Sequence, residues 1–420
     1  MLNHPSVIIN LKILNVMKKK IYYLSLGLMI LAMAGCMKKD IQPVVQDVSA
    51  GPDATLTLKS ASLTKKYIVV LKDDANISDD ADDDARNSKV KGKGHNLVTK
   101  YTSKDEIEDT YETALQGFTV KLTADQVKTI RVDPDVKYIE ENQIITLSKD
   151  VAKKSSPVAT PFTDYVPWGV ARVGGGEKKY KGDNDAWIID TGIELTHPDL
   201  NVGMKDAKSF VPDETPNDVR GHGTFIAGII GAIAGNGGIL GVAPGVKVIP
   251  VKIFAADGTA YLDQVIAAIN YVAKKAKSGD VANLSLSLNT TSDALDEAIL
   301  NASSSKRKTI DFTIAAGNEG IDASLRSPAR VKGPHIYTVS AMAVGDVWAS
   351  FSNWGKAIDY CAPGVNILST YLNGTFAENG NGTSFSSPHV AGLLLIGKIK
   401  NDGHVIGDPD GKPEPIAVHK

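Results

Sequence analysis

The stretch "LDQVIAAINYVAKKAKSGDVANLSLSL", residues 262–288, decides the fold. Its first part has apolar residues at 262, 265, 266, 269 and 272, which is the spacing of a helix with one buried face. Its last part, "VANLSLSL", is a short apolar run typical of a strand buried on both faces. A helix followed by such a strand is the repeating unit of a parallel sheet.

Similar apolar runs lie on both sides of this stretch. They are "DAWIID" (185–190), "VKVIPVKIF" (246–254), "TIDFTIAA" (309–316) and "HIYTVSAMA" (335–343). The alternation of strands and helices over residues 163–420 predicts an α/β fold, a parallel sheet with helices on both faces. Ligands of such sheets bind at the carboxyl ends of the strands.

Residues 63–148 predict a separate, small α+β domain. Strand-like runs end at Leu71, Leu122 and Leu147, and Thr123 with Gln126 has the spacing of a helix capping box. Seven aspartates within 73–84 predict a solvated loop in preference to a calcium site. Residues 37–62 and 149–162 are polar, and we expect both to be linkers, the second open to proteolysis.

Residues 1–36 predict a signal peptide. From Met17 the chain reads "MKKKIYYLSLGLMILAMAGC", a basic start and an apolar run before Cys36, and residues 1–16 add no matching feature, which favours Met17 as the initiator. The stretch resembles a bacterial lipoprotein signal with Cys36 as the lipidated residue, and a plain signal peptide cut nearby is the alternative. We expect an exported protein, either a cell-envelope lipoprotein or extracellular after processing.

The composition excludes some classes of protein. Hydrophobic residues make up 43% and charged residues 22% of the 420 residues, as expected for globular domains with a substantial core. The net charge of −2 offers no general field for nucleic acid, so no nucleic-acid partner is expected. With two cysteines, Cys36 and Cys361, no disulfide framework is implied, and we expect Cys361 to be buried.

Three polar residues stand at the ends of predicted elements. Asp190 directly follows a strand, and His222 enters a helix between two glycines in "GHGTFIAG" (221–228). Ser384 begins a helix in "NGTSFSSPHVAG" (381–392), whereas the nearby serines at 386 and 387 lie deeper in it. Each residue alone also fits a structural role. Together they supply a carboxylate, a base and a nucleophile for acyl transfer.

A fourth residue completes this set. Asn318 ends the strand-like stretch "TIAAGNEG" (313–320). Its side-chain amide could donate to a developing oxyanion alongside the backbone N–H of Ser384.

The motifs "DTGIELTHPDL" (190–200), "GHGTFIAG", "AAGNEG" (315–320) and "GTSFSSPHVAG" resemble, in this order, the subtilisin family of serine proteases on its proteinase K-like side. The likeness covers about 165–396 and implies the triad Asp190, His222 and Ser384, with Asn318 in the oxyanion hole. Residues 63–148 resemble the family's inhibitory propeptide. The resemblance implies a secreted, self-processing serine endopeptidase that works through an acyl-enzyme, with the cut between Leu147 and about Phe162.

The resemblance also implies a substrate-binding set. Its members are Gly258, Thr259, Ala260, Ser285, Leu286, Ser287, Ala315, Ala316, Gly317 and Glu319. Glu319 matches the rim of the primary specificity pocket, so basic substrate side chains are expected to be tolerated. Ser287 stands where the family usually has glycine, and its side chain is expected to narrow the pocket.

No cofactor is expected for the chemistry, and Asp199 is the candidate ligand for a structural calcium ion. The expected partners are protein or peptide substrates, the chain's own propeptide, and a membrane only through a lipid anchor; we expect a monomer. Two alternatives are a catalytically silent, surface-anchored binding module and a ligase or narrow maturation protease with the same triad. The twenty residues after 400 depart from the family's closing strand and helix.

Overall fold

The computed structural model describes residues 64–78, 82–102, 107–147 and 164–419, the last range without 178, 236, 306 and 307. Ala61–Lys420 belongs to one compact unit. The predicted signal peptide, the lipidation at Cys36 and both linkers lie outside the described residues. Within them, no helix combines the length and apolar character needed to cross a membrane.

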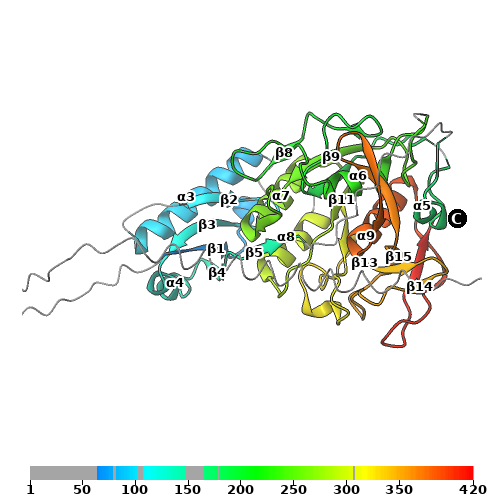
Figure 1. The fold of residues 1–420 in the computed structure, drawn as a ribbon. Helices are drawn as coiled ribbons and strands as arrows, with labels where there is room; N and C mark the ends of the chain where they lie inside the picture. Colours follow the sequence, from blue (N-terminus) through cyan, green and yellow to red (C-terminus); the bar gives the residue numbers. More distant parts are fainter. Residues whose placement is uncertain are drawn as a thin grey trace, which may run out of the picture. The chain divides into compact units, whose positions relative to one another are not determined.

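The N-terminal domain, residues 64–147, is a sheet covered by helices (Figure 1). Within the described residues its antiparallel sheet has the order β2-β3-β1-β4, followed by a separate short strand, β5. The elements are β1 (Lys65–Leu71), α2 (Ala75–Ser78), α3 (Asp83–Tyr101), β2 (Ile107–Tyr111), β3 (Gly117–Leu122), α4 (Ala124–Ile130), β4 (Val136–Glu141) and β5 (Ile144–Thr146). The predicted capping box of Thr123 and Gln126 is confirmed at the start of α4.

The aspartate-rich segment was wrongly predicted to be only a solvated loop. Helix α2 lies within it, and Asp82 caps α3 by accepting hydrogen bonds from the backbone N–H groups of Asp84 and Ala85. Carboxylates at a helix N-terminus accept hydrogen bonds from the free N–H groups there and interact favourably with the positive end of the helix dipole. The same charges that repel one another in a loop therefore favour a helix start here.

The two faces of the N-terminal sheet are buried against different partners. On β1, Val69 and Leu71 pack with α3 and α4, whereas Ile68 and Val70 pack into the core of the C-terminal domain. Side chains alternate between the faces of a strand, so each face is continuously apolar. One face makes the domain's own core, and the other is covered by the C-terminal domain.

The C-terminal domain, residues 164–419, is built on a largely parallel sheet, as predicted. Within the described residues the strand order is β18-β19-β15-β13-β12-β11-β6-β9-β7, with β14 beside β13 and β8 beside β9. The strands are β6 (Ala186–Asp190), β7 (Asn201–Val202), β8 (Lys208–Ser209), β9 (Lys247–Lys252), β11 (Val281–Leu284), β12 (Asp311–Ala315), β13 (Ile336–Ala343), β14 (Val347–Trp348), β15 (Tyr360–Pro363), β18 (Lys400–His404) and β19 (Pro415–Val418); β10 (Thr259–Tyr261) pairs with β5, and β16 (Ile367–Tyr371) with β17 (Thr375–Gly380).

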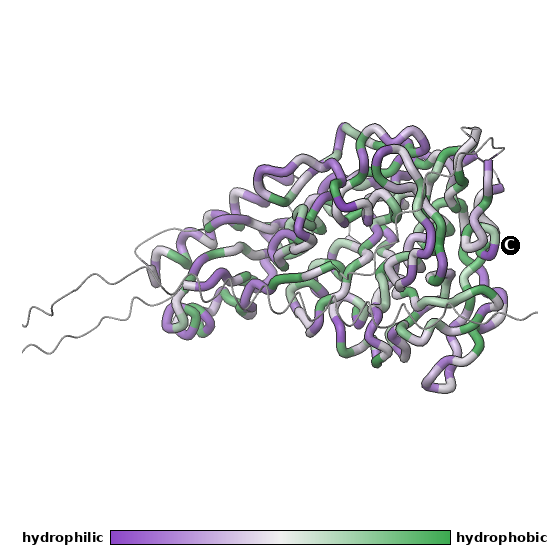
Figure 2. The backbone as a smooth tube through the Cα atoms, in the orientation of Figure 1, coloured by the Kyte–Doolittle hydropathy of each residue, from purple (hydrophilic) through white to green (hydrophobic). Residues whose placement is uncertain are grey.

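Helices cover both faces of this sheet (Figure 1). On β6, Trp187 and Ile189 face the core that contains the helices α7 and α8, and Ala186 and Ile188 face the one that contains α6 and α9. The helices are α5 (Trp168–Arg172), α6 (His222–Gly231), α7 (Leu262–Lys275), α8 (Asp293–Ser303) and α9 (Thr383–Ile396), with a 3₁₀ turn at Ala323–Leu325. Figure 2 shows the hydrophobic residues concentrated along the central strands and the hydrophilic ones in the outer loops.

Two features of this domain could not be predicted from its pattern of apolar runs. Strand β11 ends at Leu284, so the second half of the apolar run at 281–288 leaves the sheet. Near the C-terminus, β18 and β19 form a hairpin; β19 runs parallel to β15, and β18 is the outermost strand at that edge of the sheet. Cys361 of β15 is free and buried as predicted, and burial raises the pKa of its thiol well above the usual value.

Candidate active site

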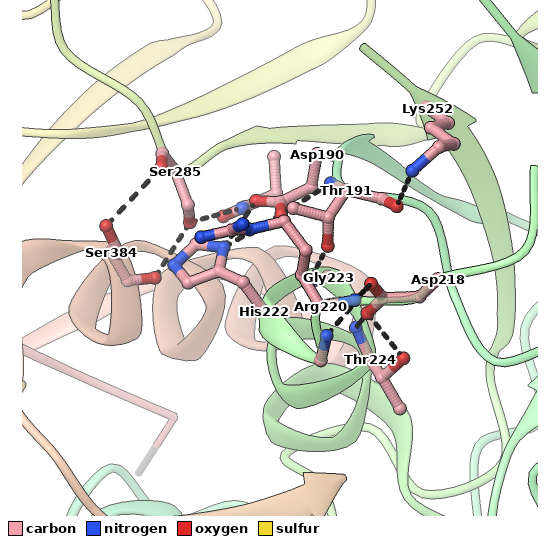
Figure 3. Close-up of polar contacts among 12 residues, drawn as sticks. Asp190, Thr191, Asp218, Arg220, His222, Gly223, Thr224, Lys252, Ser285 and Ser384 are labelled. Carbon is pink, nitrogen blue, oxygen red and sulfur yellow. Dashed lines mark hydrogen bonds and ion pairs between the residues drawn. The ribbon is translucent and has the colours of Figure 1, made fainter. Parts of the chain in front are cut away.

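The predicted acid, base and nucleophile meet at the carboxyl edge of the sheet (Figure 3). Asp190 is the last residue of β6, His222 is the first of α6, and Ser384 is the second of α9. His222 and Ser384 line a pocket of about 330 Å³ together with Asn318. Residues that are far apart in the chain thus converge on one site.

The imidazole of His222 is held by the carboxylate of Asp190. His222 Nδ1 lies 2.8 Å and 2.9 Å from the two carboxylate oxygens, and both side chains are buried. Burial is the largest influence on the pKa of His222 and lowers it, but Asp190 more than offsets this, and the pKa lies above its ordinary value. Because Nδ1 is engaged by Asp190, Nε2 is the ring nitrogen that remains available to accept a proton.

Ser384 is the only one of the three neighbouring serines that lines the pocket among the described residues. Its Oγ lies 3.4 Å from the carbonyl oxygen of Ser285, and in Figure 3 the side chain points towards the imidazole ring. Among the described residues no hydrogen bond joins it to His222, and such bonds commonly tighten only when substrate is bound. Ser386 and Ser387 are fully buried in α9.

Asn318 is oriented by its neighbour Thr383. Its Oδ1 accepts hydrogen bonds from the backbone N–H of Thr383 at 2.8 Å and from the Thr383 hydroxyl at 3.0 Å. The same hydroxyl accepts from the backbone N–H of Gly317 at 3.1 Å. Because the amide oxygen is used in this way, the Nδ2 donors remain for a ligand in the pocket.

Asp218 was missed by the sequence analysis. Its buried carboxylate accepts hydrogen bonds from the backbone N–H groups of Arg220, Gly221 and Thr224 and from the Thr224 hydroxyl. It therefore caps the helix that carries His222. An aspartate four residues before a predicted helix start was the available signal.

The positions around the start of α6 are fixed by two further contacts. Gly221 has φ +94°, and a Cβ there would meet the ring of Tyr371. Thr191 accepts a hydrogen bond from the backbone N–H of Gly223 at its hydroxyl, and its carbonyl oxygen accepts one from the fully buried Lys252. These contacts tie the strand that ends at Asp190 to the helix that begins at His222.

The end of the N-terminal domain occupies one edge of the site. Strand β5 pairs antiparallel with β10, Ile145 opposite Ala260 and Thr146 opposite Thr259. The backbone N–H of Leu147 then donates to the carbonyl oxygen of Gly258 at 2.9 Å. Thr146 and Leu147 line the same pocket as His222 and Ser384.

Most of the other predicted substrate-binding residues also line this pocket. They are Ser285, Leu286, Ser287, Ala315, Gly317 and Glu319. Ala316 is not among the lining residues; its side chain is buried, and its carbonyl oxygen accepts a hydrogen bond from Asn353.

Glu319 is engaged by other groups of the protein. Its Oε2 accepts a hydrogen bond from Asn353 Nδ2 at 2.8 Å and lies 4.0 Å from Arg326 Nε. A carboxylate with these partners is less available to a basic substrate side chain, which weakens the expected tolerance.

Asp199 lies outside this pocket, beside a glycine-rich loop. It is buried, one of its oxygens has no partner, and the other accepts from the backbone N–H of Ile239. Burial raises the pKa of Asp199 to about 7, and Asp164, which accepts hydrogen bonds from the N–H groups of Gly235 and Gly237, adds to the effect. Within the described ranges, no three Asp, Glu, His or Cys side chains gather as a metal site.

Comparison with known proteins agrees with this geometry. Residues 187–404, slightly more than half of the chain, match the model of the subtilase family. The chain belongs to the subtilase family. Residues 66–148 of this subtilase match the peptidase inhibitor I9 family, so an inhibitory propeptide domain precedes the protease domain.

Several relatives of this subtilase are named proteases. It is 32% identical over 368 residues to alkaline serine protease ver112 of Corniculantispora psalliotae, covering 84% of this chain and 83% of that protein. It is 34% identical over 301 residues to alkaline serine exoprotease A of Vibrio alginolyticus. This match covers 69% of the present chain but only 53% of the Vibrio protein. A cold-adapted subtilisin-like serine proteinase matches with TM-score 0.51 and 30% identity, over 60% of this chain and 98% of the other. The protein is a subtilisin-like serine protease.

Proposed function

We propose that the protein is an exported serine endopeptidase that is made as a self-processing zymogen. The observation that carries the proposal is the pairing of His222 Nδ1 with Asp190 in a pocket that also holds Ser384 and the end of the propeptide domain. A histidine that is hydrogen-bonded to a carboxylate and lies beside a serine can take the proton of the serine hydroxyl and so activate it for attack on a peptide carbonyl.

The reaction follows from the positions of these groups. Ser384 Oγ attacks the peptide carbonyl while His222 Nε2 takes its proton, and Asp190 stabilises the charged ring. The oxyanion accepts hydrogen bonds from Asn318 Nδ2 and the backbone N–H of Ser384. The ring then protonates the leaving amine, and a water molecule activated by the same ring hydrolyses the acyl-enzyme.

The contacts of the propeptide's end support self-processing. A strand that pairs with β10 and continues to Leu147 enters the pocket in the way that an extended substrate would. We place the cut in the first few residues after Leu147. The segment that follows lies outside the described residues, and the cleaved tail would remain as an inhibitor until it dissociates or is digested.

Two further parts of the proposal concern the location and a metal ion. The signal-like N-terminus supports export, with lipid attachment at Cys36 as the means of membrane association. The unpartnered buried oxygen of Asp199 and the nearby carboxylate of Asp164 support a structural calcium ion, because calcium prefers oxygen ligands. Neither feature takes part in the chemistry.

The test is to purify the chain from Met37 and follow its intact mass beside the variant Ser384→Ala. We expect the parent alone to release a fragment ending shortly after Leu147, and then to hydrolyse casein. If both proteins keep their full mass and neither cleaves casein, the alternative of a catalytically silent, surface-anchored binding module is favoured.

A further inference from the structure

The loop of the C-terminal hairpin carries two carboxylates that the proposed protease function does not use. It joins β18 to β19 and reads "VIGDPDGKPE", residues 405–414. Asp408 Oδ1 accepts a hydrogen bond from the backbone N–H of Asp410, and Asp410 Oδ1 accepts one from that of Lys412. These bonds fold the loop, but they leave Asp408 Oδ2 and Glu414 Oε2 without a hydrogen-bond donor among the described residues.

The side chain of Glu414 is the unusual member of this loop. The residue is 5% exposed, and its Oε2 is buried without a hydrogen-bond donor among the described residues. Asp408 Oδ2 is likewise buried and unpartnered. The two carboxyl groups lie within hydrogen-bonding reach of each other, and each has one oxygen that is shielded from solvent.

Within the described part of the chain, no lysine, arginine or histidine forms an ion pair with Asp408 or Glu414. Two carboxylates in contact and removed from water cannot both stay ionised unless a positive charge joins them. Either one of them holds a proton, or a cation binds between them.

We propose that Asp408 and Glu414 bind a calcium ion in the loop of the C-terminal hairpin. Calcium takes six to eight oxygen ligands in flexible geometry, and two carboxylates can supply up to four of them. Backbone carbonyl oxygens of the loop and water supply the others. Gly411, which has φ +73°, lies in the loop between Asp408 and Glu414.

The ion would hold the closing edge of the main sheet. The backbone N–H of Val405 donates to the carbonyl oxygen of Glu414 at 3.1 Å, and Ile416 pairs with Cys361 of β15. Val405 and Ile416 pack in one apolar cluster, with Trp348 against it. Fixing the loop therefore fixes the hairpin on the sheet, and a ligand that binds only the folded state raises its stability.

The test measures binding and stability in the full chain, without any need for activity. The parent protein is Ser384→Ala, which prevents self-digestion, combined with Asp199→Asn, which removes the other candidate calcium ligand. After removal of metal with a chelator, calcium is titrated by calorimetry, and the midpoint of thermal unfolding is measured with and without calcium. Glu414→Gln is added to this parent as the test variant.

The parent and the variant are expected to differ in their response to calcium. Without calcium, Glu414→Gln should be at least as stable as the parent, because it removes one of two repelling charges. With calcium, the midpoint of the parent should rise to saturation, and the variant should lose this shift. Terbium, used as a luminescent probe, should be sensitised by Trp348, whose backbone N–H donates to Ile406 in the same loop, and calcium should compete with it.

The proposal is overturned by an equal calcium shift in parent and variant, or by no binding of either metal at neutral pH. In the second case the pair shares a proton, and its stabilising effect would follow pH instead of calcium. A shift that is lost in Asp408→Asn as well as in Glu414→Gln supports a site that needs both carboxylates.

Discussion

Replacing Asn270 by alanine should loosen the propeptide without changing the protease. Asn270 lies in α7, and its buried Oδ1 accepts three hydrogen bonds from the propeptide, from the backbone N–H groups of Glu112, Thr113 and Ala114 at 3.2, 2.8 and 3.0 Å. Its Nδ2 also donates to Glu112 Oε2 at 3.0 Å. One side chain therefore provides the hydrogen-bond acceptor for three consecutive backbone N–H groups of the propeptide.

The size of the effect follows from these donors. In the variant, docking buries three N–H groups without a partner, and each such group costs about 1 kcal/mol at the low end, since water can enter the space that the side chain leaves. The total of about 3 kcal/mol corresponds to roughly hundredfold weaker binding. Asn301→Ala is the matched control, because it removes a single hydrogen bond, 3.0 Å long, to the carbonyl oxygen of Ala114. It should weaken binding only about fivefold.

The assay uses the processed complex, in which the cut propeptide is still bound. Serial dilution into a chromogenic peptide substrate gives, from initial rates, the concentration at which half of the enzyme is free. Once the propeptide has been digested, wild type and Asn270→Ala should have the same kcat/KM, because the residue is remote from the pocket. If Asn270→Ala weakens inhibition no more than Asn301→Ala does, the triple hydrogen bond does not hold the propeptide.

Three further results are expected. Asn318→Ala should lower kcat by roughly 10²–10³ with little change in KM, the effect known for this donor in subtilisin, and an unchanged kcat in steady-state assays would remove it from the oxyanion hole. The Arg220 guanidinium lowers the pKa of His222, so Arg220→Gln should move the acid limb of the kcat/KM profile to higher pH; a shift to lower pH would contradict this. Burial raises the pKa of Glu112 and of Glu140 in the zymogen, so docking takes up protons. The affinity of the protease for its propeptide should therefore be greatest below the ordinary glutamate pKa of about 4.3, and it should fall as pH rises through the raised pKa values of Glu112 and Glu140. Binding that tightens with rising pH would refute this expectation.

Much of the fold and of the candidate site could be predicted from local sequence patterns. The helix at α7, the buried strands and the capping box at Thr123 follow from periodicity and spacing within a few residues. The positions of Asp190 at a strand end and of His222 and Ser384 at helix starts also follow from local pattern, because the carboxyl ends of parallel strands share one edge.

What the sequence by itself determined is therefore the order and type of the elements and the residues at their ends. Only the tertiary structure decided which distant groups meet. Asn270 and Glu112 are 158 residues apart, and Asp190 and His222, whose side chains pair in the pocket region, are 32 residues apart. Periodicity reports which face of an element is apolar, whereas the partner of a buried polar group depends on how separate elements pack in space.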